Sequence, residues 1–195
     1  MVGSCQQQSL DDRSETEGSR EMEVTSTIKL SSRQQWRDWL AEHHATETVV
    51  WLPADDRPEE STVAYLDSVE EALCFSWIDG LAKCISPFER AQRFTPRRER
   101  SNWTDLNKQR ARRLIKDGLM TDAGKRTLPD LLAPFKIANV IIEEIQSAPG
   151  ALVYFQELPD LYFRVRIGYI EEMRNSPAEF KKRLRSFIAK TVARK

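Results

Sequence analysis

The sequence is poor in the residues on which most catalytic and metal sites depend. It has three cysteines, two histidines and seven glycines among 195 residues. His43 and His44 are adjacent, so on a helix they would point about 100° apart and could not bind one metal ion together. The sequence contains no Cys/His cluster, no serine-hydrolase motif and no glycine-rich phosphate loop. We therefore predict no metal and no cofactor.

Long apolar runs are also missing. Without a stretch of about 18 apolar residues, no helix is expected to span a membrane. The N-terminus resembles neither a secretory signal nor a mitochondrial presequence, because it is acidic and has no apolar core. Cys5, Cys74 and Cys84 form no CxxC pattern, which favours a reducing compartment over a disulfide framework. We expect a cytoplasmic protein.

The first 27 residues differ in composition from the rest of the chain. They are rich in Ser, Gln, Glu and Thr, and they carry few large apolar side chains. Such a segment cannot bury enough surface to offset its ordering entropy. We predict a disordered acidic tail over residues 1–27, an α+β domain over 28–130 and a helical C-terminal region over 131–195.

Capping boxes and apolar spacing predict the elements of the first half. Ser32 and Gln35 form a capping box that begins a helix over residues 32–43. A second box, Ser68 with Glu71, predicts a short helix that ends near Ser76. Residues 48–52 are β-branched and aromatic and predict a strand before the acidic loop 54–61. The runs 77–85 and 90–95 predict a hairpin that turns at residues 86–87.

Only helices are predicted after the hairpin. They cover residues 104–117, closed by Gly118, then a turn from Thr121, a helix around 137–145, a helix after Ser147, residues 161–173, and a last helix from Ser176. The order predicts an α+β fold, in which a small antiparallel sheet with flanking helices precedes an all-helical C-terminal region.

Charge is balanced overall but not along the chain. The sequence has 30 basic and 30 acidic residues, yet residues 42–79 hold ten acids and one base. Residues 83–113 and 164–195 each hold ten bases and three acids. This asymmetry fits an anionic partner, and it equally fits acidic and basic parts that pack together or form separate solvated faces.

The arginines around Pro96 are the strongest candidate for a site. Arginine binds carboxylate and phosphate with two parallel hydrogen bonds, and a nearby Trp can stack on a ring or base. Alternatively, Asp79 pairs with one of these arginines and fixes the hairpin, while the tryptophans fill the core. The candidate ligand-binding residues are Trp77, Asp79, Lys83, Arg93, Arg97, Arg98, Arg100, Trp103 and Asn107.

Three runs resemble the YdeI/OmpD-associated, or bacteriocin-protection, proteins. They are residues 70–80 (EEALCFSWIDG), 92–110 (QRFTPRRERSNWTDLNKQR) and 113–124 (RLIKDGLMTDAG). Residues 36–52 and 151–160 fit the same pattern, so the resemblance covers about residues 28–192. It implies a stress-protection factor linked to bacteriocin or cationic-peptide resistance and to an outer-membrane porin, with no established reaction or cofactor.

The chain departs from that family at three places. Ser76 stands where the family usually has Gly. Near the C-terminus, Met173-Arg174 and Glu179-Phe180 replace an expected Ala-Lys pair and Thr-Arg pair. Any partner contacts that the family makes through this tail are therefore not implied for this chain.

These observations favour a non-enzymatic interaction module that binds a protein partner or a small anionic ligand through the arginine-rich hairpin. One alternative is a nucleic-acid-binding module built on residues 83–113 and 164–195, although a net charge of zero counts against it. The other is a small enzyme with a site around Asp79 and Cys74. Cys74 lies between Leu73 and Phe75 and can equally be a small buried hydrophobe.

Overall fold

The computed structural model describes Val24 and residues 27–54, 63–86 and 89–193. These residues form two compact units, which we treat separately. The N-terminal unit contains the described residues up to Ser101 together with 114–128, and the C-terminal unit contains residues 102–113 together with 129–193. Most of the predicted acidic tail, most of the loop over residues 54–61 and Pro87 of the predicted turn lie outside the described residues.

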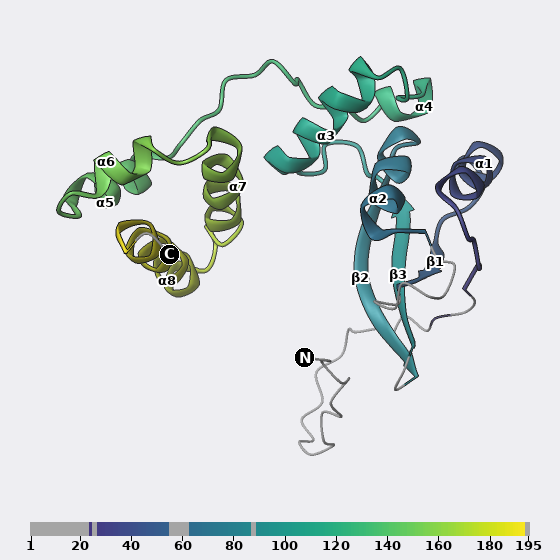
Figure 1. The fold of residues 1–195 in the computed structure, drawn as a ribbon, viewed down its shortest axis with the longest axis horizontal. Coiled ribbons are helices and arrows are strands. Elements are labelled where there is room, and N and C mark those ends of the chain that lie inside the picture. The colour runs from purple at the N-terminus through teal and green to yellow at the C-terminus, as the bar shows by residue number, and fades with distance from the viewer. Residues whose placement is uncertain (1–23, 25–26, 55–62, 87–88, 194–195) are drawn as a thin grey trace. The chain divides into compact units, whose positions relative to one another are not determined.

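A three-stranded antiparallel sheet forms the centre of the N-terminal unit (Figure 1). Its strands are β1 (Val50–Pro53), β2 (Trp77–Ser86) and β3 (Glu89–Pro96), in the order β1-β3-β2. The predicted hairpin of β2 and β3 is confirmed. β1 begins at Val50 and includes Pro53, whose missing N–H is tolerated because β1 is an edge strand.

Two helices pack beside this sheet, and only one of them begins where the sequence predicts. In α1 (Arg33–His43), the Gln35 N–H donates to Ser32 Oγ at 3.2 Å, which confirms the first capping box. α2 (Tyr65–Cys74) begins three residues before Ser68, so the second box is wrong. The Ser68 hydroxyl donates instead to the Tyr65 carbonyl at 2.8 Å, inside the helix.

Tryptophans join the helices to the sheet. Trp36 and Phe94 are fully buried, with ring centroids 5.4 Å apart. The Trp36 Nε1 donates to the Ser68 carbonyl at 3.0 Å, and the Trp77 Nε1 donates to the His44 carbonyl at 3.1 Å. Because both indole N–H groups have acceptors, both rings can fill the core without leaving a buried donor unsatisfied.

A buried carboxylate ties α2 to α1. The Glu71 side chain is 2% exposed and accepts hydrogen bonds from Arg33 Nε and Arg37 Nη1, each at 2.6 Å. Arg33 also pairs with Asp67 at 2.8 Å, and Arg37 Nη2 donates to the Leu119 carbonyl at 2.8 Å. The carboxylate of Glu71 therefore takes part in an ion-pair network and not in a helix cap.

The chain that follows α3 (Asp105–Lys116) returns to the end of α2. Gly118 has φ 70°, which ends α3 as predicted, and Thr121 begins α4 (Asp122–Lys125) by accepting from the Gly124 N–H at 3.2 Å. A Cβ on Gly124 would lie 2.3 Å from the Cys74 carbonyl oxygen. Only glycine allows this close approach of the two backbones.

Ser76 occupies a strained position between α2 and β2. Its φ is 60°, in the left-handed region that glycine adopts without strain. Its hydroxyl donates to the Ala123 carbonyl at 2.5 Å and lies 2.9 Å from the Thr127 hydroxyl. These hydrogen bonds to the α4 segment offset the strain of a backbone conformation that glycine would adopt more easily.

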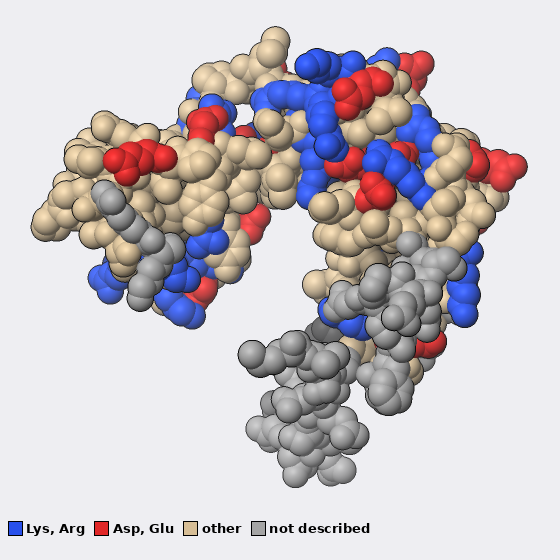
Figure 2. All heavy atoms as spheres, in the orientation of Figure 1, with Lys and Arg blue, Asp and Glu red and all other residues tan. Residues whose placement is uncertain are grey.

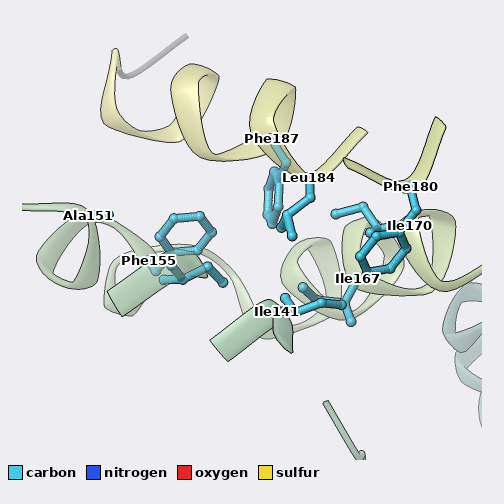
Figure 3. Close-up of a cluster of buried hydrophobic side chains, with 9 residues drawn as sticks. Ile141, Ala151, Phe155, Ile167, Ile170, Phe180, Leu184 and Phe187 are labelled. Atoms are coloured by element: carbon cyan, nitrogen blue, oxygen red, sulfur yellow. The ribbon is translucent and has the colours of Figure 1, made fainter. Parts of the chain in front are cut away.

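Four helices make the core of the C-terminal unit: α5 (Asn139–Ser147), α6 (Ala151–Gln156), α7 (Asp160–Glu171) and α8 (Pro177–Val192). Their buried side chains face one another in Figure 3. The cluster consists of Ile141, Ile145, Ala151, Phe155, Ile167, Ile170, Phe180, Leu184 and Phe187. The α+β fold with an all-helical C-terminal region is thereby confirmed.

The Cys74 side chain is buried and its thiol is free. The reducing compartment inferred from the sparse cysteines stays a prediction. Among the described helices, none has the length and apolar character needed to cross a membrane.

Replacing either of two glycines with alanine should change the free energy of unfolding, in opposite directions. Gly124→Ala forces a Cβ against the Cys74 carbonyl and should destabilise the N-terminal unit by about 2–3 kcal/mol. Gly168→Ala, inside α7 with no atom within 4 Å of its added Cβ, should stabilise the C-terminal unit by about 0.5–1 kcal/mol. Urea unfolding followed by tryptophan fluorescence and by circular dichroism checks both; equal effects would contradict the packing described here.

Glu71→Gln should destabilise the N-terminal unit strongly. It removes the buried charge that neutralises Arg33 and Arg37, and we expect a loss of about 3 kcal/mol. Asp67→Asn is the matched control, because Asp67 pairs with the same Arg33 but its side chain is 40% exposed, and it should cost about 0.5 kcal/mol. Urea unfolding of both variants decides the point, and similar losses would refute a special role for Glu71.

Candidate functional site

A cavity of about 350 Å³ lies between α2 and the sheet of the N-terminal unit. This volume is in the range of small-molecule sites. Its described lining contains one base and no acid, although the surrounding segment 42–79 holds ten acids. The lining residues are Leu52, Pro53, Ala54, Val63, Ala64, Tyr65, Ser68, Ala82, Arg90 and Gln92.

The floor of the cavity is one row of the sheet. Leu52 and Ala82 both pair with Gln92, so the three side chains come from β1, β3 and β2 at the same level. Gln92 is 8% exposed, and its Nε2 donates to the Gly80 carbonyl at 2.6 Å. This bond holds the irregular stretch of β2 between Asp79 and Ala82, where the register shifts.

Arg90 supplies the positive charge. It is exposed on β3, two residues before Gln92 and therefore on the same face of the strand. It forms no ion pair with any residue that the structure describes. Arg90 is thus the one base of the described lining, and no described carboxylate neutralises it.

The first turn of α2 forms the opposite wall. Ala64 stands at the N-cap position and provides no side-chain hydrogen bond to the turn. The N–H groups of an uncapped first turn carry a partial positive charge. These N–H groups and the guanidinium of Arg90 are the positive groups of the described lining, while the same turn also carries the acid Asp67.

Tyr65 connects the cavity to the predicted residue Asp79. The Tyr65 hydroxyl donates to Asp79 Oδ2 at 2.7 Å. Asp79 also acts on Arg97, which is 5% exposed and donates from Nη1 to Ser101 Oγ at 3.2 Å. Burial lowers the pKa of Arg97 to about 10, and the negative charge of Asp79 opposes that shift.

The other predicted residues do not form one exposed patch. Trp77 is a core residue, Lys83 is half-buried, and Arg98 and Arg100 are exposed. Arg93 is half-buried on β3 beside Gly80. The Arg97 guanidinium, in contrast, is packed inside the unit, and the role of these residues in ligand binding stays a prediction.

Trp103 and Asn107 belong to the C-terminal unit. Trp103 is buried, and Asn107 accepts a hydrogen bond from Arg110 Nη1 at 2.8 Å. The hairpin arginines belong to the other compact unit. Tyr65, Arg90 and Gln92 were missed as site residues, because no local motif shows that strand pairing and α2 bring them to one cavity.

Metal ligands and the sulfur and imidazole side chains are the remaining candidate chemical groups of the described residues. No three side chains of His, Cys, Asp or Glu within the described part of the chain could hold a metal ion. Burial, followed by the charge of Glu71, raises the pKa of Cys74 to about 11, so its thiol stays protonated at neutral pH. The His44 Nδ1 lies 2.8 Å from the Leu40 carbonyl of its own helix.

Comparison with known proteins gives one match. Residues 28–127 match the family described as Domain of unknown function (DUF8412). No curated protein and no solved structure matches the chain. The resemblance to YdeI/OmpD-associated proteins is not among these findings, and neither is a role in bacteriocin protection. The match spans more than half of the sequence, so this chain belongs to the DUF8412 family.

Proposed function

We propose that the N-terminal unit is a non-enzymatic binding module for a small anionic ligand, or for an anionic group of a protein partner. The observation that carries the proposal is the cavity beside α2, which Arg90 lines and which has no carboxylate among its described lining. A carboxylate or phosphate would pair with the Arg90 guanidinium and accept from the first-turn N–H groups of α2.

The other lining residues of the cavity suit the organic part of a small-molecule ligand. Leu52, Val63 and Ala82 provide apolar contacts, and Gln92 and Ser68 are polar groups within the same lining. Apolar walls with a few polar groups are typical of small-molecule sites. Asp79 and the buried Arg97 serve in this proposal as supports of the hairpin, since Asp79 is already bonded to Tyr65.

The nucleic-acid alternative receives no specific support. Arg112 Nη2 donates to the Leu131 carbonyl at 2.5 Å, and Arg183 Nη1 donates to the Tyr169 carbonyl at 2.7 Å. Both arginines lie in the basic segments on which that alternative depends. The enzyme alternative is weakened by the protonated thiol of Cys74.

Anion binding should depend on Arg90. For the unmodified chain, inorganic phosphate or citrate at about 100 times its dissociation constant should raise the free energy of unfolding by about 2.7 kcal/mol. Arg90→Met should abolish the corresponding rise in melting temperature. Arg98→Met, which removes an exposed arginine outside the cavity, should leave it intact.

A second variant distinguishes anion binding in the cavity from a non-specific effect of the protein's charge. Ala82→Leu keeps every charge but fills the cavity from β2, so it should weaken the same anion shift. If Arg98→Met and Arg90→Met act alike, or if Ala82→Leu has no effect at any salt concentration, the cavity is not the binding site.

Cys74 should be inert in the folded protein. Because its pKa is about 11 and its side chain is buried, iodoacetamide at pH 8 should not modify it, whereas it should be modified in concentrated urea. Peptide mapping by mass spectrometry measures the modification at this residue. Rapid modification of native Cys74 at pH 8 would instead support the enzyme alternative.

A further inference from the structure

The cavity beside α2 combines one charged donor with neutral side chains whose own donors are already in use. The polar side chains of its described lining are Tyr65, Ser68, Arg90 and Gln92. Arg90 is the base on which the proposed anion site depends. The hydrogen bonds of the three neutral side chains show which atoms remain for a ligand, and so which groups a ligand must carry besides its negative charge.

Two carbonyl groups fix the orientation of the Gln92 amide. Its Nε2 donates to the Gly80 carbonyl at 2.6 Å and to the Arg93 carbonyl at 3.3 Å. The reverse orientation would bring Oε1 against two other oxygens, so the network determines which atom is nitrogen. Oε1 accepts no hydrogen bond from any residue that the structure describes, and neither Gly80 nor Arg93 lines the cavity. Gln92, which is 8% exposed, therefore offers the cavity an acceptor.

The hydroxyl groups of Ser68 and Tyr65 also donate within the protein. Ser68 Oγ donates to the Tyr65 carbonyl at 2.8 Å, and the Tyr65 hydroxyl donates to Asp79 Oδ2 at 2.7 Å. A hydroxyl has one proton and two lone pairs, so Ser68, which is 3% exposed, keeps only acceptor capacity. An acceptor atom of a ligand would have to displace the Ser68 bond, whereas an O–H group of a ligand would add a bond to it.

The described acids nearest the cavity have partners within the protein. Asp67, in the first turn of α2, pairs with Arg33 at 2.8 Å, and Glu70 lies 3.4 Å from the same guanidinium. Asp79 accepts the tyrosine hydroxyl described above. In agreement with such pairs, Figure 2 shows red and blue atoms interspersed over the helices that Figure 1 labels α1 to α4. Within the described lining, a ligand thus meets one charged side chain, Arg90, and one guanidinium balances one carboxylate.

We propose that the ligand of this cavity is a small hydroxy-carboxylate, whose carboxylate pairs with Arg90 and whose hydroxyl donates to Gln92 Oε1 or Ser68 Oγ. This inference rests on the proposed anion-binding function and names the class of ligand. Arg90 and Gln92 are two residues apart on one face of β3, which separates their Cα atoms by about 6.8 Å. A chain of about three to five carbons reaches both partners at that spacing, with Leu52 and Ala82 in contact with its apolar part.

A hydroxyl matches the cavity better than an ammonium group or no donor at all. The acceptors on Gln92 and Ser68 are neutral and the described lining has no carboxylate, so an ammonium would bring a second positive charge beside Arg90 without a counter-ion. A ligand without a donor would displace water from both acceptors and leave them without a partner. Sites that hydrogen-bond a ligand hydroxyl discriminate strongly against analogues that lack it.

The test compares ligands of equal charge on the full chain. Ligand-observed NMR titrations give dissociation constants for butyrate and for the three hydroxybutyrates with the hydroxyl on the second, third or fourth carbon. One of the hydroxybutyrates should bind about tenfold more tightly than butyrate, and the three should differ from one another. The loop over residues 55–62 holds four acids and lies outside the described residues, but all four ligands carry the same charge, so its effect cancels in the comparison.

Variants of the two acceptors locate the hydroxyl contact. Ser68→Ala or Gln92→Met, whichever removes the acceptor in use, should reduce the preference for the best hydroxybutyrate over butyrate about fivefold. Gln92→Met should also lower the melting temperature, because it loses the bond to Gly80. Ser147→Ala is the matched control: Ser147 Oγ likewise donates to the carbonyl three residues before it, at 2.9 Å, but lies on α5 outside the cavity. This variant should keep the full preference.

The outcomes separate this inference from the anion-binding function. Equal dissociation constants for butyrate and all three hydroxybutyrates would refute hydroxyl recognition and leave anion binding at Arg90 in place. Tighter binding of an aminobutyrate than of any hydroxybutyrate would refute it too, as would a preference that neither Ser68→Ala nor Gln92→Met reduces. If none of these carboxylates binds, and neither phosphate nor citrate does, the anion-binding function itself is wrong and this inference is wrong with it.

Discussion

The carboxylate of Glu71 is almost completely shielded from water, and the N-terminal unit is arranged to make that possible. An isolated buried carboxylate would cost several kcal/mol, so Arg33 and Arg37 of α1 must face α2 with their donors at hydrogen-bond distance. Arg37 extends the constraint to the chain after α3 through the Leu119 carbonyl. The position of α2 that results brings its first turn over β1 and β3, where the cavity with Arg90 lies.

The two units achieve their cores by different means. The N-terminal unit buries a charged network and indole N–H groups with defined acceptors, which demands particular partners at particular distances. The core of the C-terminal unit is a cluster of aliphatic and phenyl side chains without such polar requirements. The same apolar character continues to the surface of α5 and α6, where Ile142, Leu152 and Val153 are exposed.

The cavity lined by Arg90 lies within residues 28–127, the part of the chain that matches the DUF8412 family. The proposed anion-binding role would therefore belong to the family domain and not to the helical region that follows it.

Local chemistry in the sequence determined much of the fold. The Ser32 cap, the helix stop at Gly118, the Thr121 cap and the Pro177 helix start each depend on neighbours within a few residues, and the structure has all four. The runs 77–85 and 90–95, separated by the turn residues 86–87, likewise predicted the β2–β3 hairpin.

Tertiary structure decided the rest, since it depends on partners far apart in the sequence. The local sequence around Ser68 and Glu71 predicts a helix cap. In the structure, Glu71 instead binds arginines 34 and 38 residues away, and α2 begins before Ser68. The sequence suggested that Arg97 is a surface arginine, but in the folded unit its side chain is buried near Asp79. The cavity required the register that aligns Leu52, Gln92 and Ala82, and no spacing along the chain encodes that alignment.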